Sequence, residues 1–188
     1  MNKLLLVVDP QIDFISGSLA IEGAAQVMEA LANYIRQSDG QYIYKVVTTD
    51  WHPYSHCSFN EQGGIWPQHC VQNSIGAAIY PSLIAPLNTT KGPLKVLRKG
   101  DNEKKEEYSV FANQSSLGHI QLIVKLKEIE QIDICGIAGD YCVLETLKDG
   151  IKMFGKDKWN VLLPYCASID GGAMLNNFIK KEFINHFI

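Results

Sequence analysis

The sequence predicts an α/β fold, a three-layer sandwich in which a central, mostly parallel sheet is flanked by helices. Short apolar runs of strand length alternate with longer segments whose apolar residues recur at helical spacing. Hydrophobic residues make up 46% of the 188 residues and charged residues 20%, as in an ordinary globular protein. No internal repeat or linker divides the chain, so we expect a single domain over residues 1–188.

Five apolar runs have the character of buried strands. They are Leu4–Val8, Ile43–Thr48, Lys95–Leu97, Ile132–Gly136 and Val161–Leu163. Apolar residues at helical spacing predict helices between and after these runs, around Val27–Ile35, over Ile120–Ile129, from Val143 to Phe154 and over Met174–Phe183. The stretch from Trp51 to Pro93 is rich in Pro, Gly, Asn and His. A loop of that length in a compact domain is usually functional.

Charge and composition exclude several classes of partner. The formal net charge is −3, which does not favour binding to nucleic acid or to an anionic membrane. The lysines between residues 125 and 158 are interleaved with acids, as on a solvated helix surface. The first apolar run is too short for a signal peptide or a membrane span, so a cytoplasmic protein is expected. The five cysteines include no CxxC pair and predict no disulfide framework.

Reactive side chains follow four of the predicted strands. Ligands of open parallel sheets bind beyond the carboxyl ends of the strands, so these positions sample a candidate site. In chain order they are Asp9, Asp50 with His52, Lys99, and Asp140 with Cys142. An acid, an acid with a histidine, a lysine and a thiol are therefore expected at one edge of the sheet.

The stretch GIAGDYCV contains the candidate nucleophile. Its glycines allow a tight strand-to-helix turn, and Asp140 is a plausible helix cap. Cys142 would then lie in the first turn, where free N–H groups and the helix dipole favour a thiolate. Asp9 would be the base and Lys99 would hold it in place. A lone cysteine beside Val143 is more often a buried core residue, and only the other reactive residues expected at the sheet edge favour a catalytic role.

Histidines cluster in the long loop region. In DWHPYSHC, Asp50 and His52 are two residues apart and point the same way if the segment is extended. His69, in IWPQHCVQ, would complete a two-histidine, one-carboxylate set for a divalent ion. The alternative is that these histidines are merely hydrogen-bonded in a polar loop. His119 and His186 have no candidate metal ligands near them in the sequence and are expected at the surface.

Six motifs together resemble the nicotinamidases of the isochorismatase-like cysteine hydrolase family. They are VVDPQIDF, VTTDWHPYSHCSF, GIWPQHCVQN, LRKG, EEYSVF and GIAGDYC, in order from about Lys3 to about Ser168. The sequence departs from the usual pattern at Gly139, where a threonine is common, and at Val110, where a glycine is usual. Neither change removes a functional group from the matched motifs, but both bear on the shape of the pocket.

The resemblance implies roles for particular residues. It implies a catalytic triad of Asp9, Lys99 and Cys142. It implies a cis peptide between Ile137 and Ala138, with an oxyanion hole formed by the N–H groups of Ala138 and Cys142. It implies metal ligands at Asp50, His52 and His69, with His56 nearby and open as a further ligand. The positions that match the ring pocket are Phe14, Leu19, Trp66, Tyr108 and Tyr141.

The activity implied by the resemblance is that of a metal-dependent cysteine amidohydrolase, which converts nicotinamide to nicotinate and ammonia in NAD salvage. One divalent metal ion is implied, with zinc as the first expectation and iron or manganese as alternatives. Two other readings stay open. One is a related hydrolase of small amides or ureides on the same scaffold, and the other is a non-catalytic metal-binding member. The sequence also leaves open whether the protein is a homo-oligomer.

Overall fold

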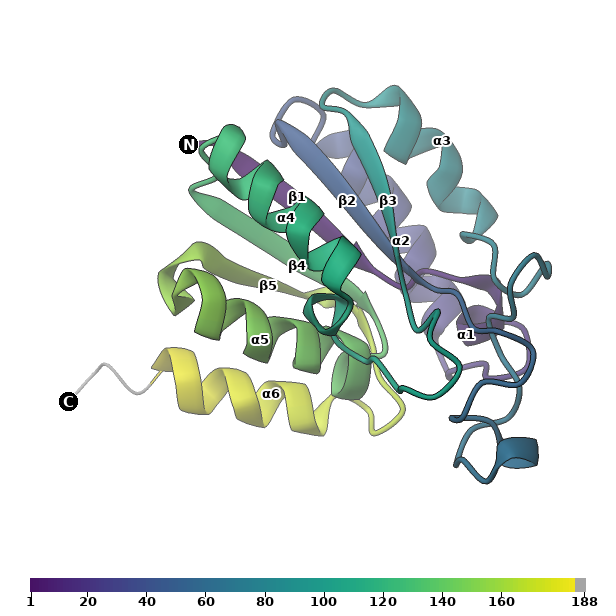
Figure 1. Ribbon diagram of the computed structural model, residues 1–188. Coiled ribbons are helices and arrows are strands. Elements are labelled where there is room, and N and C mark those ends of the chain that lie inside the picture. Colours follow the sequence, from purple (N-terminus) through teal and green to yellow (C-terminus); the bar gives the residue numbers. More distant parts are fainter. Residues whose placement is uncertain (185–188) are drawn as a thin grey trace.

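Five parallel strands form the centre of the molecule in the computed structural model, which describes residues 1–184 (Figure 1). The predicted surface position of His186 lies outside the described residues. The strand order is β3-β2-β1-β4-β5, and each neighbouring pair is parallel. The strands are β1 (Lys3–Val8), β2 (Tyr44–Asp50), β3 (Leu94–Lys99), β4 (Gln131–Ile137) and β5 (Trp159–Ala167). The predicted parallel sheet is confirmed.

Helices cover both faces of the sheet, which confirms the three-layer sandwich (Figure 1). One face carries α1 (Ile12–Ile15), α2 (Ala24–Gln37) and α3 (Pro81–Thr89). The other face carries α4 (Gln114–Leu126), α5 (Leu144–Phe154) and α6 (Ala173–Ile179). Short helical turns are η1 (Asn60–Gln62), η2 (Val110–Ala112), η3 (Gly139–Val143), η4 (Lys156–Lys158) and η5 (Lys180–Ile184).

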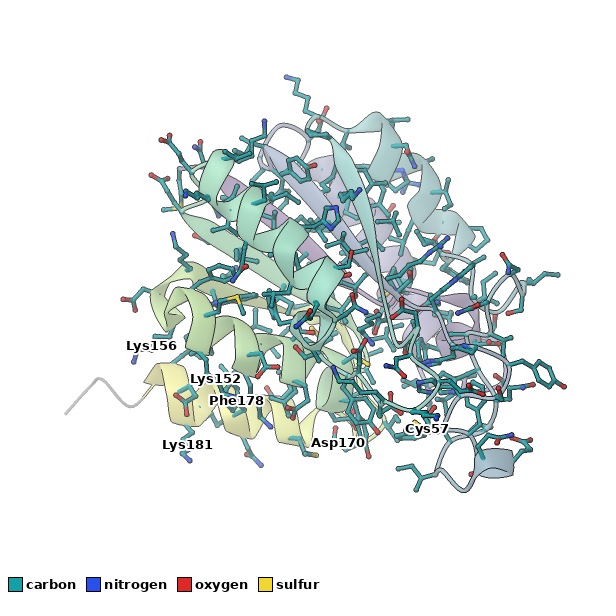
Figure 2. All side chains as sticks on the ribbon, viewed as in Figure 1. Cys57, Lys152, Lys156, Asp170, Phe178 and Lys181 are labelled. Carbon is teal, nitrogen blue, oxygen red and sulfur yellow. The ribbon has the colours of Figure 1, made fainter. Side chains whose placement is uncertain are left out.

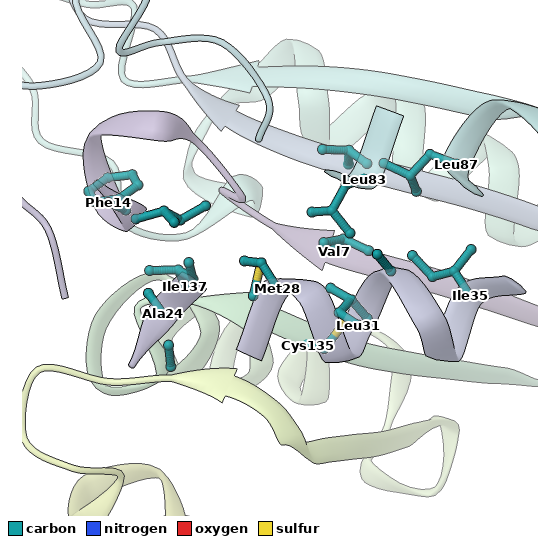
Figure 3. Packing of buried hydrophobic residues seen from close by; sticks show 14 of the residues in the cluster. Val7, Phe14, Ala24, Met28, Leu31, Ile35, Leu83, Leu87, Cys135 and Ile137 are labelled. Atoms are coloured by element: carbon teal, nitrogen blue, oxygen red, sulfur yellow. The ribbon is translucent and has the colours of Figure 1, made fainter. Parts of the chain in front are cut away.

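Each face of the sheet has its own hydrophobic core. Figure 3 shows the first, where Met28, Leu31 and Ile35 of α2 pack against Val7 and Cys135 of the two central strands. On the other face, alternate residues of β1 pack beneath α4 and α5. The central strands are thus buried on both sides. This explains why most residues of β1 and β4 are apolar without alternation, the buried Asp133 of β4 being an exception.

The helices of the structure differ from the predicted ones in three places. The stretch from Trp51 to Pro93 contains α3, where Leu83 and Leu87 are buried against α2 although the prolines and asparagine resemble loop residues. Helix α4 begins at Gln114, ahead of the predicted start, because the Asn113 side chain caps it by accepting the Ser116 N–H at 3.2 Å. It ends at Leu126 rather than Ile129. The last helix, α6, ends at Ile179 and passes into the wider turn η5.

The late lysines lie on the solvent side of the helices, as predicted. Lys148 pairs with Glu145 at 2.7 Å and Lys152 with Asp149 at 3.0 Å, and Figure 2 shows Lys152 and Lys181 on the α5–α6 side of the molecule. Exposed pairs of this kind contribute little to stability. Within residues 1–184, none of the helices has the length and hydropathy that crossing a bilayer requires.

Candidate active site

The four strand-end groups meet at the carboxyl edge of the sheet. Asp9 follows β1, Asp50 ends β2, Lys99 ends β3, and Cys142 lies in the turn after β4. The ammonium Nζ of Lys99 lies 2.8 Å from Asp9 Oδ2, 2.5 Å from Asp50 Oδ1 and 3.4 Å from Cys142 Sγ. All four side chains are buried. The structure therefore brings together the acid, the amine and the thiol that the sequence singled out.

The backbone and one hydroxyl fix the carboxylate of Asp9. Its φ of 43° turns the chain sharply at the end of β1, and its N–H donates to Thr48 O at 3.1 Å. The Thr48 hydroxyl donates to Asp9 Oδ1 at 2.6 Å. Because Thr48 takes one carboxylate oxygen, the other is left facing Lys99.

Cys142 lies in a turn that is wound more widely than predicted. The peptide between Ile137 and Ala138 is cis, as the resemblance implied, and η3 follows as a single π-helical turn, in which the Val143 N–H donates to Ala138 O at 3.0 Å. The prediction that Asp140 caps the helix is wrong. Its carboxylate instead accepts the N–H groups of Ile169 and Asp170, at 3.2 and 2.9 Å, and ties the turn to the loop after β5.

Burial is the largest influence on the pKa values of Cys142, Asp9 and Lys99. It raises the pKa of the Cys142 thiol well above its ordinary value, although Lys99 acts in the opposite direction. The expectation that the turn by itself favours a thiolate is therefore wrong, and the resting thiol needs a base. Burial also raises the pKa of Asp9, which makes its carboxylate a stronger base than an exposed one. Burial opposes the charge of Lys99, but Asp50 and Asp9 outweigh it and raise the pKa of that ammonium.

Asp50, His52 and His69 are arranged as metal ligands. Each offers one donor atom, and the three atoms lie within 4.8 Å of one another. Nδ1 of His52 lies 2.9 Å from Gly100 O, and Nδ1 of His69 lies 2.8 Å from Pro67 O. A ring nitrogen that donates to a carbonyl carries the proton, so Nε2 of each ring keeps its lone pair for a metal. Two imidazoles and a carboxylate fit a divalent ion with open positions.

His56 lies beside this set with both ring nitrogens engaged. Its ring stacks on that of His52 with 4.1 Å between centroids. Nδ1 accepts the Ser58 N–H at 3.3 Å and also contacts the Ser58 hydroxyl, while Nε2 donates to Lys105 O at 3.1 Å. This hydrogen bonding joins the loop of His56 to the loop of Lys105. A donor atom of His56 also lies within 4.8 Å of donor atoms of His52 and Glu106, so His56 remains a candidate for a further ligand.

A pocket opens onto the thiol and two of the metal-ligand candidates. Asp50, His69, Ala138 and Cys142 line it together with all five residues predicted for the ring pocket, Phe14, Leu19, Trp66, Tyr108 and Tyr141. The aromatic residues of the pocket also contact one another. Trp66 Nε1 donates to the Tyr108 hydroxyl at 3.0 Å, and the rings of Trp66 and Tyr141 meet edge to face.

Three pocket residues escaped the sequence reasoning: Ile21, Glu106 and Ile169. Ile169 lies just after the end of β5 at Ala167, and the predicted run Val161–Leu163 ended too early to point to it. Glu106 stands two residues before Tyr108, and its carboxylate has an oxygen within 4.8 Å of donor atoms of His52 and His56. Ile21 carries no signal in the sequence beyond its hydrophobicity.

The two departures from the family pattern are accommodated locally. A Cβ added at Gly139 would lie 2.1 Å from Ser168 Oγ, so the hydroxyl of Ser168 fills the space that a larger residue at this position would need. Val110 is fully buried in the core beneath α4 and α5, and its N–H donates to the Thr146 hydroxyl at 3.3 Å. Neither residue lines the pocket.

A buried thiol, carboxylate and amine at the edge of a parallel sheet, next to a set of candidate metal ligands, are the groups that a metal-dependent cysteine hydrolase requires. The chain belongs to the isochorismatase family, because the family model described as Isochorismatase domain matches residues 3–153.

The relatives agree with this class. The chain is 32% identical to the nicotinamidase of Escherichia coli over 89% of its own length and 84% of that protein. It superposes on the pyrazinamidase of Pyrococcus horikoshii in complex with zinc with a TM-score of 0.79, at 29% identity and covering 96% of both chains. For a protein from L. infantum in complex with nicotinate, the TM-score is 0.81 at 29% identity, covering 96% of this chain and 89% of that one.

Proposed function

We propose that the protein hydrolyses nicotinamide to nicotinate and ammonia as a metal-dependent cysteine amidohydrolase. The observation that supports this best is the shared pocket. One aromatic cavity is bounded by the Cys142 thiol and by Asp50 and His69, so a planar ring can contact the metal ligands while its substituent faces the thiol. The relatives named as nicotinamidases, and the related structures with nicotinate and with zinc, support the same substrate.

Asp50, His52 and His69 would hold the ion, and we assign zinc because a closely similar chain binds it. When bound, the ion supplies a Lewis acid that anchors a ring nitrogen and so orients the substrate. Phe14, Leu19, Trp66, Tyr108 and Tyr141 would enclose the ring.

In the first half-reaction, Asp9 takes the proton of the Cys142 thiol and the sulfur attacks the carboxamide carbon. The carbonyl oxygen becomes an oxyanion, and the backbone N–H groups of Ala138 and Cys142 stabilise it, a contribution of about 2.7–4 kcal/mol per donor in measured enzymes. The C–N bond then breaks as Asp9 returns the proton to the departing nitrogen. Ammonia leaves and a thioester remains on Cys142. Lys99 keeps Asp9 oriented throughout by its 2.8 Å ion pair.

In the second half-reaction, Asp9 removes a proton from water, whose oxygen attacks the thioester carbon. The C–S bond breaks, Asp9 returns its proton to the sulfur, and the nicotinic acid leaves as nicotinate after losing its proton to solvent. The same carboxylate thus acts first as base and then as acid in each half-reaction, which suits a buried acid with a raised pKa.

The experiment measures ammonia and nicotinate from nicotinamide with wild type and Cys142→Ala. Wild type should release both products in equal amounts, and Cys142→Ala should bind nicotinamide but release neither. Pyrazinamide and an acyclic ureide test the alternative substrates. Turnover of the ureide in preference to nicotinamide would favour another hydrolase on this scaffold, and inert wild-type protein loaded with zinc would refute the proposed activity.

A further inference from the structure

We infer that Gln11 and Asp13, in the turn after β1, are positioning residues for the metal centre. Asp13 is not a member of the cluster of Asp50, His52 and His69, and the amide oxygen and nitrogen of Gln11 are hydrogen-bonded to the backbone. Both instead hold the backbone of the segments on which those ligands stand. The inference depends on the metal site of the proposed function and assigns these two side chains a part in building it.

The side-chain amide of Gln11 makes the hydrogen bonds to the Asp50 backbone that a neighbouring strand would otherwise make. The register of β1 with β2 ends at Val7 and Val47, and one more backbone hydrogen bond joins the Asp9 N–H to Thr48 O, so Asp50 at the end of β2 lies beyond its inner neighbour. There the side-chain amide of Gln11 donates to Asp50 O at 2.8 Å and accepts the Asp50 N–H at 2.7 Å. On its other edge, Asp50 is in register with Lys99 of β3. The backbone of this ligand is therefore held from both sides.

The remaining N–H of the same amide reaches the long loop. Gln11 Nε2 also donates to Ala77 O, at 3.0 Å, in the segment that follows His69. Gln11 is fully buried, and the two donors and one acceptor of its amide all have protein partners. A buried amide with these partners has a single satisfactory orientation, because turning it by 180° would oppose like groups.

Asp13 holds the loop at the residue next to His69. Its Oδ2 accepts the Cys70 N–H at 2.7 Å, and Cys70 has a φ of 47°, a conformation that non-glycine residues seldom adopt. The carboxylate lies close against the chain, because a Cβ added at Gly76 would lie 2.0 Å from Asp13 Oδ2. A larger residue at position 76 would therefore displace the Asp13 carboxylate from Cys70.

Backbone hydrogen bonds connect the Cys70 segment to His52. The His52 N–H donates to Cys70 O at 3.0 Å, and the Gln72 N–H donates to His52 O at 2.9 Å. All three ligand segments are therefore joined, directly or through one residue, to the turn that also follows Asp9. The short motif DPQIDF thus supplies the proposed base and sets the spacing of the metal ligands.

The test measures zinc affinity at equilibrium, by titrating metal-free protein in competition with a chromophoric chelator. Changes in groups that orient metal ligands typically weaken binding by about 10–100-fold, and this is the loss expected for Gln11→Met and for Asp13→Ala. Asp13→Asn keeps an oxygen to accept the Cys70 N–H and should bind zinc nearly as wild type does. Gln41→Met and Asp157→Ala, at exposed positions, are the matched controls.

The melting temperature of each metal-free variant reports stability separately. If Gln11→Met or Asp13→Ala does not fold, Gln11→Glu decides the matter. It keeps the acceptor for the Asp50 N–H but sets an oxygen against two carbonyls, so it should also weaken zinc binding. Wild-type affinity in the folded variants, or equal losses in Asp13→Asn and Asp13→Ala, would overturn the inference and leave the proposed function intact. If wild type itself binds no zinc, the metal site fails and the inference with it.

Discussion

Lys99 donates to Asp50 across 2.5 Å, although one residue belongs to the proposed catalytic triad and the other to the proposed metal centre. The same ammonium pairs with Asp9 at 2.8 Å. Two carboxylates so close together would repel each other in a buried site, and the lysine between them compensates both charges. The two halves of the site therefore share one cation.

Replacing this lysine should destabilise the fold as well as the site. Lys99→Met keeps the approximate shape of the side chain but leaves two buried carboxylates without a cation. Breaking a buried ion pair typically costs about 3–5 kcal/mol, and we expect a loss of that order in the free energy of unfolding in urea. Lys95→Met, on the same strand but partly exposed, is the control. Equal free energies of unfolding of the two variants would show that charge compensation by Lys99 does not stabilise the fold.

Removal of the metal should abolish turnover and lower thermal stability together. An ion that binds only the folded protein stabilises it by about 2.7 kcal/mol at a concentration 100 times its dissociation constant. Treatment with a chelator should stop ammonia release, and added zinc should restore both activity and melting temperature. Cys142→Ala should show the same zinc-dependent rise in melting temperature without activity. A rise that persists undiminished in Asp50→Asn would place the ion elsewhere.

Gly139 and Ser168 should behave as a coupled pair. Gly139→Ala puts a methyl group where Ser168 Oγ stands, 2.1 Å from the new Cβ, and overpacking of this kind costs about 1–3 kcal/mol. Ser168→Ala removes the conflicting oxygen, so the double variant should recover most of the loss. Urea unfolding of the four proteins of this cycle gives the interaction energy. Strictly additive effects would mean that the hydroxyl does not occupy this space.

Glu107 should contribute stability that disappears in acid. Burial raises its pKa, but hydrogen bonds from Lys105, Asn113 and the Gly100 N–H outweigh this and lower the pKa below the ordinary value of 4.5. A lowered folded-state pKa gives stability that is complete above 4.5 and is lost as the pH falls through the folded-state value.

Glu107→Gln removes this charge and should be less stable than wild type at pH 7 by about 1.5–3 kcal/mol. The difference should shrink as the pH falls below the ordinary glutamate range. Urea unfolding at a series of pH values measures it, and Glu61→Gln, at an exposed position, is the control. A difference that grows toward acid pH would contradict the sign of the shift.

The sheet was predictable from the sequence because its strands are buried on both faces. Leu4–Val8 could be read directly, since nothing polar interrupts it, and Ile132–Gly136 is interrupted only by the buried Asp133. The edge of the sheet was predictable for the same reason, because the polar residues that follow such strands stand out. Helix α3 was missed because burial of Leu83 and Leu87 against α2 is a tertiary effect that the local prolines conceal.

Other features depend on partners far away in the sequence. Asp140 has the composition of a helix cap, but its hydrogen bonds go to Ile169 and Asp170, about thirty residues on. The raised pKa of the Cys142 thiol follows from burial, which outweighs the neighbouring ammonium and which no local motif reveals. The roles of Gln11 and Asp13 became visible only when their contacts with Asp50 and Cys70 were placed in space.

A covalent intermediate on Cys142 is the central claim, and rapid quenching tests it most directly. Zinc-loaded protein mixed with excess nicotinamide and quenched in acid should carry a nicotinoyl group on the peptide that contains Cys142, detected by mass spectrometry. The adduct should appear during turnover, decay as substrate is consumed, and be missing from Cys142→Ala. Turnover at full rate with unmodified Cys142 peptide at every time point, or by the alanine variant itself, would contradict the account.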